Sequence, residues 1–186
     1  WSFASVPSGS NVTLSDPSAV SPTFVVDATG TYDLQLIVND GVTDSVADHM
    51  IVSTINSAPV ANAGADQSVF VTQTVTLNGS GSSDVDGDAL TYLWQITSAP
   101  AGSAAALNDP TAVMPTFIVD LPGTYVIGLV VSDSFVPSAA DAVTITTENS
   151  APVANAGPAQ TPFVGDTVTL DGTGSTDVDG DTLTYA

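Results

Sequence analysis

The sequence predicts an all-β protein made of sandwiches of short strands. Short runs rich in Val, Ile, Thr and aromatic residues alternate with Gly, Pro, Ser and Asp, as strands alternate with turns. No segment carries an apolar stripe with the 3.6-residue period of a helix. The landmarks also return after 93 residues, beginning with Trp1 and Trp94. An apolar content of 43% in 186 residues is enough to bury a core.

Six strands are expected within one copy of the repeat. They cover residues 67–71, 74–79, 90–96, 116–119, 124–132 and 140–147. About seven short strands in a unit of this size are typical of an immunoglobulin-like β-sandwich, which buries a Trp on one strand and places a Tyr at a corner. We therefore expect Trp94 in the core and Tyr125 at a corner of the sandwich.

The repeat organises the whole chain. Residues 1–93 and 94–186 align without a gap, and 52 positions are identical. A polar Asn-Ser-Ala-Pro segment begins at Asn56 and again at Asn149, where it interrupts the strand pattern. These joints predict the C-terminal part of one repeat at 1–55, a complete repeat at 56–148 and the N-terminal part of a third at 149–186. We expect the chain to be a window on a longer tandem array.

The charge has one sign. The chain has no Lys or Arg, 20 acidic residues and one His, and its formal net charge is −20. Nucleic acid and anionic membrane surfaces are therefore unfavourable partners. The apolar runs are too short to cross a bilayer, so no membrane insertion is expected within this segment. The chain has no cysteine, and a disulfide is excluded.

Two motifs carry a family resemblance. The run Ser83-Asp-Val-Asp-Gly-Asp-Ala-Leu-Thr-Tyr-Leu-Trp94, followed by Pro122-Gly-Thr-Tyr-Val-Ile-Gly-Leu-Val-Val-Ser-Asp133, resembles the PKD (polycystic kidney disease) domain and its bacterial Ig-like relatives. The resemblance covers the whole repeat. It implies an extracellular β-sandwich, usually in tandem, that serves as a spacer, stalk or adhesion module, and some bacterial members bind calcium near the linker. It does not fix a ligand.

A cluster of aspartates precedes Trp94. Asp84, Asp86 and Asp88 lie within five residues, and no basic side chain can neutralise them. Closely packed carboxylates stay ionised when a cation joins them, and Ca²⁺ prefers hard oxygen ligands. The loop is not an EF-hand, because Gly87 is at the fourth position and Gln95 occupies the place of the bidentate Glu.

The folded sandwich is expected to complete this site. If the loop joins the second and third strands, it lies at the end of the sandwich that also holds the incoming linker and the loop after the later strand. The candidate ligands in the middle repeat are Asp84, Asp86, Asp133, Asn56 and Ser57, with Asp88 expected to turn outward or to shape the loop. Their repeat equivalents are Asn149, Ser150, Asp177, Asp179 and Asp181 in the third copy and Asp40 in the first. The alternative is a solvated turn in which the aspartates bond their own backbone.

The function expected from these features is structural. No Gly-x-Ser-x-Gly motif is present, and the single His49 cannot serve a repeating active site, so we do not expect an enzyme. The leading hypothesis is a secreted or cell-surface stalk, adhesin shaft or fibre, stiffened by Ca²⁺ at its joints. The alternative is an accessory module that helps a secreted hydrolase bind an insoluble polysaccharide or protein. Neighbouring copies are the expected partners, residues 149–186 of one completing residues 1–55 of the next as in a filament.

Overall fold

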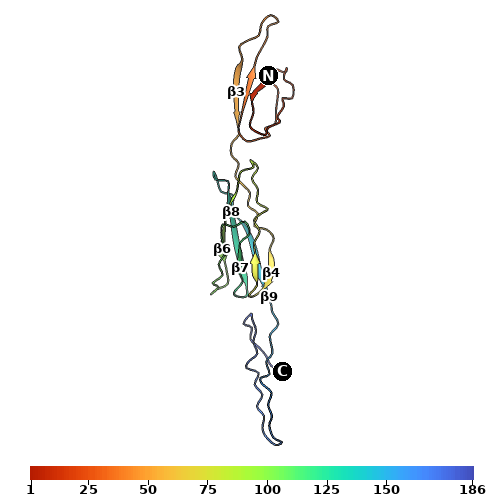
Figure 1. The fold of residues 1–186 in the computed structure, drawn as a ribbon, viewed down its shortest axis with the longest axis vertical. Helices are drawn as coiled ribbons and strands as arrows, with labels where there is room; N and C mark the ends of the chain where they lie inside the picture. The colour runs from red at the N-terminus through yellow and green to blue at the C-terminus, as the bar shows by residue number, and fades with distance from the viewer. The chain divides into compact units, whose positions relative to one another are not determined.

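The computed structural model describes residues 1–186 and contains nine strands and no helix (Figure 1). The strands are β1 (Ser2–Ser5), β2 (Thr31–Leu36), β3 (Asp48–Ser53), β4 (Gln67–Phe70), β5 (Thr74–Thr76), β6 (Thr91–Ser98), β7 (Thr116–Ile118), β8 (Thr124–Ser132) and β9 (Asp141–Glu148). The all-β class is confirmed, and each of the six strands expected in the middle repeat is present. The structure holds no helix of the length and apolar character needed to span a bilayer.

The chain divides into two compact units. The first comprises residues 1–58 and 84–89, and the second comprises residues 59–83 and 90–186. The divisions after residues 55 and 148 that the sequence suggested stay predictions. The aspartate loop of the middle repeat thus belongs to the same unit as the linker residues that precede Pro59.

The second unit contains the sandwich of the middle repeat. One sheet has the strand order β4-β9-β8-β6, and β5 pairs with β7 in a smaller antiparallel ladder. Strand β8 lies inside the larger sheet, where its residues alternate in burial. Tyr125, Ile127, Leu129 and Val131 are fully buried, and the residues between them are half-buried. This period of two turns one face of β8 towards the core.

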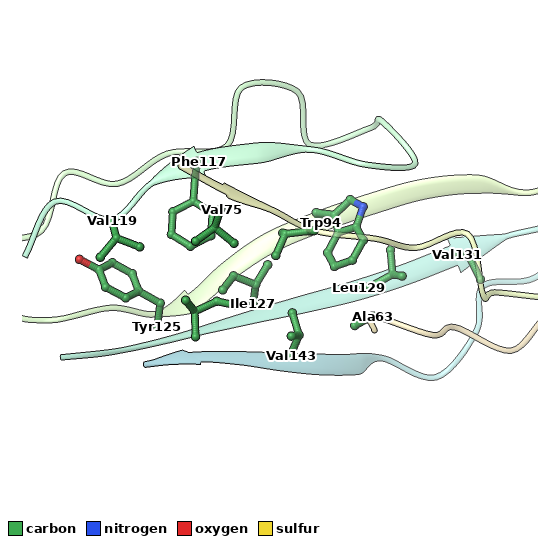
Figure 2. Packing of buried hydrophobic residues seen from close by; sticks show 12 residues of the cluster. Ala63, Val75, Trp94, Phe117, Val119, Tyr125, Ile127, Leu129, Val131 and Val143 are labelled. Atoms are coloured by element: carbon green, nitrogen blue, oxygen red, sulfur yellow. The ribbon is translucent and has the colours of Figure 1, made fainter. Parts of the chain in front are cut away.

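The core of the middle repeat gathers around Trp94. Its indole belongs to one buried cluster of apolar side chains from both sheets, which also contains Phe117 from β7 and Leu129 from β8 (Figure 2). The indole Nε1–H donates a 3.1 Å hydrogen bond to the carbonyl oxygen of Ala112, so the one polar atom of the ring is satisfied. The expectation that Trp94 belongs to the core is confirmed.

A buried tyrosine fixes the turn before β8. The Tyr125 hydroxyl lies 2.8 Å from Asp120 Oδ1 and 2.8 Å from the Leu121 carbonyl oxygen, and it accepts a hydrogen bond from the Leu121 N–H. The first repeat forms the same network with Tyr32, Asp27 and Ala28. Both repeats therefore form this turn with the same hydrogen bonds.

The first unit has a three-stranded antiparallel sheet of order β1-β2-β3. Its apolar side packs Phe3, Phe24 and Tyr32 together, with an edge-to-face contact of 5.3 Å between the two phenylalanine ring centroids. On the other side of the strands His49 is exposed, and its Nδ1 lies 2.7 Å from Asp33 Oδ1. His49 is therefore an exposed residue of strand β3.

Candidate metal centre at the repeat joint

Asp84 shapes the aspartate loop. Its Oδ1 accepts hydrogen bonds from the backbone N–H groups of Asp86 at 2.8 Å and Asp88 at 3.3 Å, which is the Asx-turn expected of a carboxylate at the start of a turn. Gly87 has a φ of 81°, in the left-handed region that favours glycine. The chain can therefore reverse at Gly87 without strain.

The third repeat forms the same turn. Asp177 Oδ1 accepts from the N–H groups of Asp179 at 2.9 Å and Asp181 at 3.3 Å, and Gly180 also has a φ of 81°. Two copies of the loop, in two different compact units, thus adopt one conformation. The sequence of the loop dictates its shape.

A second carboxylate ties the loop to the linker. Oδ2 of Asp86 accepts a 2.6 Å hydrogen bond from the backbone N–H of Ser57. In the third repeat, Oδ2 of Asp179 accepts the equivalent bond from Ser150 at 2.5 Å. Hydrogen bonds to an ionised acceptor are short and are stronger than neutral ones. The bond joins segments 29 residues apart in sequence at each joint.

The side chain of the linker asparagine continues this arrangement. Asn56 Nδ2 donates to the carbonyl oxygen of Ser57 at 3.0 Å, and Asn149 Nδ2 donates to that of Ser150 at 3.1 Å. These bonds hold the linker in one conformation beside the loop. The linker therefore presents its backbone to the aspartates in the same way at both joints.

Each loop also buries one carboxylate oxygen that accepts no hydrogen bond. In the middle repeat this atom is Oδ2 of Asp84, and in the third repeat it is Oδ1 of Asp179. A buried anionic oxygen without a partner is costly, because it has lost water and gained nothing in return. Either a bound cation or an ordered water molecule would satisfy it.

The carboxylates are close enough together to share one ion. One oxygen from each of Asp84, Asp86 and Asp88 lies within 4.8 Å of the others. Two oxygens that each bind Ca²⁺ at about 2.3 to 2.6 Å lie at most about 5 Å apart. The spacing and the all-oxygen donor set therefore fit a hard divalent cation.

An open hollow borders the loop at both joints. At the first joint it measures about 220 Å³ and includes Asp27, Thr54 and Asp86 in its lining. At the second joint it measures about 240 Å³ and includes Asp179 and other acidic residues, with Thr147 in the place of Thr54. Solvent and ions can reach the aspartates from this side.

The predicted ligands are divided between the two compact units, and the carboxylates that cluster closely are those of Asp84, Asp86 and Asp88. The first unit holds Asn56, Ser57, Asp84, Asp86 and Asp88, and the second holds Asn149, Ser150, Asp177, Asp179 and Asp181. Asp133 is a buried residue of the second unit, and its Oδ1 accepts from the N–H groups of Phe135 and Val136 at 2.8 Å. Asp40 of the first unit binds the N–H groups of Val42 and Thr43 in the same manner. The inclusion of Asp133 and Asp40 in a metal shell stays a prediction.

Sequence reasoning missed the acidic residues contributed by the preceding repeat. Asp27 lines the hollow of the first joint, and Glu148 lines that of the second. Asp27 recurs as Asp120, three residues before the Gly-Thr-Tyr of each copy, and this recurrence was the available signal. Glu148 has no such signal, because Ile55 occupies its place in the first repeat.

Strong hydrogen bonds hold Asp120 ionised. The Ser103 hydroxyl and the Ala104 N–H each donate to its carboxylate at 2.6 Å. The Ser103 bond, followed by the Ala104 bond, lowers the pKa of Asp120 to about 2. The pKa of Asp27 is lowered for the same reason, first by the Ser10 hydroxyl and then by the Asn11 N–H.

The middle repeat is similar to domains of known families. Residues 63–147 match the family model described as K319L-like, PKD domain. The dyslexia-associated protein KIAA0319 homolog of Mus musculus is 35% identical over 158 residues, which cover 81% of this chain and 14% of that protein. The Homo sapiens protein KIAA0319 is 32% identical over 159 residues, with coverages of 81% and 15%. The chain spans about one seventh of the length of these curated relatives.

A solved structure is also similar. The solution structure of the PKD domain from the KIAA 1837 protein is 28% identical, and the match covers 59% of this chain and 100% of that domain with a TM-score of 0.39. The match of residues 63–147 to the PKD family model confirms the resemblance that the two sequence motifs indicated.

Proposed function

Because residues 63–147 form a PKD-type domain, we propose that the chain is a non-catalytic, structural array of such domains, whose joints are stiffened by calcium. The array serves as a stalk, adhesin shaft or fibre outside the cell, as the family resemblance implies. Units that contact mainly their neighbours supply length and spacing. The observation that carries this proposal is the repeated bond between linker and loop, from Ser57 to Asp86 and from Ser150 to Asp179.

The charge of the chain supports calcium as the stiffening ion. The loop carboxylates have no Lys or Arg anywhere in the sequence to neutralise them. One oxygen of Asp84 already shapes the turn, and the other is buried without a partner. The turn and the metal site therefore use different oxygens of the same side chain. Ca²⁺ bound there would pull the carboxylates together and, through Asp86, hold the linker more firmly.

Calorimetry tests the calcium site. We expect Ca²⁺ at about 10 mM, well above the dissociation constants of about 10⁻⁴ to 10⁻³ M of extracellular modules, to raise the melting temperature relative to chelator. Asp84→Asn should lower the number of bound ions by one in titration calorimetry. Asp109→Asn is the matched control, because it removes the same charge from an Asx-turn outside the loop. Equal melting temperatures with calcium and with chelator would contradict the metal site.

The stiffening itself needs a separate readout. Small-angle X-ray scattering of the wild-type chain should show a narrower distribution of interatomic distances with Ca²⁺ than with chelator, and Asp84→Asn should reduce this difference. If Ca²⁺ binds but the scattering does not change, the ion site exists and the proposed stiffening of the joint is wrong.

The alternative, an accessory module of a secreted hydrolase, needs an exposed row of aromatic side chains. Trp94, Tyr125 and Tyr32 are all buried, which favours the structural array. Binding of the chain to an insoluble polysaccharide in a pull-down, lost on substitution of an exposed aromatic such as Phe135, would favour the hydrolase module instead.

A further inference from the structure

We propose that the middle repeat binds a second copy of this chain side by side, through the outer face of the sheet β4-β9-β8-β6. The outer face is the side of this sheet that points away from the core around Trp94. The middle repeat is complete, and segments of the repeats before and after it belong to the same chain. Leu93 on the outer face is 58% exposed with both flanking segments present. The inference goes beyond the proposed function and does not depend on calcium.

The outer face carries no charge. Side chains alternate between the two faces along each strand, so the outer face holds the residues between the buried ones. They are Ser68 and Phe70 on β4, Ala142, Thr144 and Thr146 on β9, Val126, Gly128 and Val130 on β8, and Leu93, Gln95 and Thr97 on β6. The face therefore combines apolar and hydroxyl side chains with one amide, in a chain that has 20 acidic residues.

The nearest carboxylates lie at the border of the outer face. Glu148 ends β9, and Asp66 precedes β4, where its Oδ1 accepts the Thr144 N–H. Asp141 begins β9, but its Oδ2 accepts the N–H of Ala63, a residue of the core cluster, and its carboxylate therefore turns away from the outer face. The half of the face that β6 and β8 form has no acidic residue.

This distribution of charge indicates which partner fits. A chain with a net charge of −20 repels a second copy, and salt of physiological strength screens the repulsion only beyond about 8 Å. A basic partner would bind the acidic loops, because the outer face offers it no carboxylate. Two copies that meet through their outer faces bring together the surfaces that repel least. The face therefore suits a partner as acidic as the chain itself.

The sheet of the first unit also keeps this side nearly free of net charge. Its positions equivalent to Val126 and Ala142 are Asp33 on β2 and His49 on β3. Asp33 Oδ1 lies 2.7 Å from His49 Nδ1, and His49 is the only side chain of the sequence that can carry a positive charge. The one acidic residue on this side of β2 thus has the one basic side chain beside it.

The shape of the outer face allows it to pair with itself. Leu93 is exposed opposite Val130, and the next outer position of β8, Gly128, has no side chain and lies opposite Gln95. A protruding side chain and a low position on one surface are what a two-fold contact between identical faces needs. The outer face of one copy can therefore receive the leucine of the other.

The size of the face predicts a weak contact. Its strands are about 4.8 Å apart, and the nine residues of β8 extend about 30 Å. Two copies would bury about 1,000 Å², which is near the lower limit for a specific interface. Several repeats that bind together in a longer array would strengthen the contact.

Sedimentation equilibrium tests the contact, with the chain in about 0.15 M salt and a chelator. The weight-average mass should rise above the 18.6 kDa of the monomer between about 10 μM and about 1 mM. Leu93→Asp should raise the dissociation constant at least about tenfold, because it buries an unpaired charge on each copy. Ile118→Asp is the matched control, since Ile118 is 57% exposed on β7 in the other sheet. This control should associate as the wild type does.

A second measurement locates the contact without a substitution. In NMR spectra of the wild-type chain, the amide signals of Leu93 and Gly128 should shift as the concentration rises, whereas that of Ile118 should stay unchanged. Sodium chloride at about 0.5 M should strengthen the association, because it screens the repulsion between the copies.

Three results would overturn the proposal. The first is a wild-type chain that stays monomeric at every concentration, in which case the outer face meets a different partner or none. The second is an equal loss of association in the Leu93→Asp and Ile118→Asp variants while circular dichroism shows both to be folded. The third is association with signal shifts confined to residues 1–55 and 149–186, which would mean that the copies meet elsewhere.

Discussion

The backbone N–H of Ser150 donates a 2.5 Å hydrogen bond to Oδ2 of Asp179, and Ser57 and Asp86 form the same bond 93 residues earlier. The two bonds lie in different compact units. Their agreement means that the repeat sequence itself closes the linker onto the aspartate loop. The same residues therefore form the same hydrogen bond between linker and loop in both repeats.

Asp86→Ala should loosen the first joint. It removes the acceptor of the Ser57 N–H, and we expect the local opening free energy at Ser57 to fall by about 1 kcal/mol, seen as faster amide hydrogen exchange. The nearby Val85→Ala is the control, because Val85 is exposed and its side chain accepts no hydrogen bond. Unchanged exchange at Ser57 in the Asp86→Ala variant would mean that the bond does not hold the linker.

Tyr125→Phe should destabilise the middle repeat by about 1 to 3 kcal/mol. The change leaves the ring in the core but removes the hydroxyl that bonds Asp120 and Leu121. The measurement is urea unfolding followed by fluorescence. Tyr185→Phe serves as the control, since Tyr185 is largely exposed. Equal stability of the two variants would contradict a structural role for the hydroxyl.

The stability of the chain should fall in acid partly through Asp120. The pKa of Asp120 in the folded protein is about 2, below its ordinary value of 3.8, so the ionised carboxylate stabilises the fold above pH 3.8. This contribution is lost as the pH falls from 3.8 towards about 2. Thermal melts across this range should show a smaller loss for Asp120→Asn than for the wild type. Identical pH profiles would show that Asp120 contributes nothing to acid sensitivity.

Added sodium chloride should raise the melting temperature. Repulsion among 20 acidic residues dominates, because the sequence has no Lys or Arg to offset it. Screening of that repulsion favours the folded state. Calcium chloride at the same ionic strength should raise the melting temperature further if the loops bind the ion. A fall in melting temperature with sodium chloride would mean that attractive charge pairs outweigh the repulsion.

The sequence predicted the strands well, because residues of high β-propensity lie between clear turn signals. The expected strand 74–79 is shorter in the structure, where β5 ends at Thr76. Its last residues still bond across the sandwich, since the Leu77 N–H donates to the Pro115 carbonyl oxygen and the Gly79 N–H to that of Val113. Hydrogen bonds between these two segments thus continue beyond the regular strand, and the β-propensity of the residues does not predict where the regular geometry ends.

The sequence predicted which residues form the candidate site, but it did not predict the hydrogen bonds that they make. The spacing of Asp84, Asp86 and Asp88 indicated an acidic loop from the sequence alone. That Asp86 binds Ser57, and that Asp84 uses one oxygen for the turn and buries the other, depends on the folded path of the linker. Contacts between segments far apart in sequence set these roles, and no local pattern encodes them.

The pairing of β4 with β9 governs how the middle repeat bears tension. The two strands are parallel, in register from Gln67 with Ile145 to Phe70 with Glu148, and they are the first and last strands of the repeat. A force that pulls the chain from both sides therefore drags β4 and β9 in opposite directions along their length. Their hydrogen bonds are loaded in shear and must break together, whereas bonds loaded from one end would open one at a time. The pairing of β4 with β9 therefore resists a force that pulls on the two ends of the repeat.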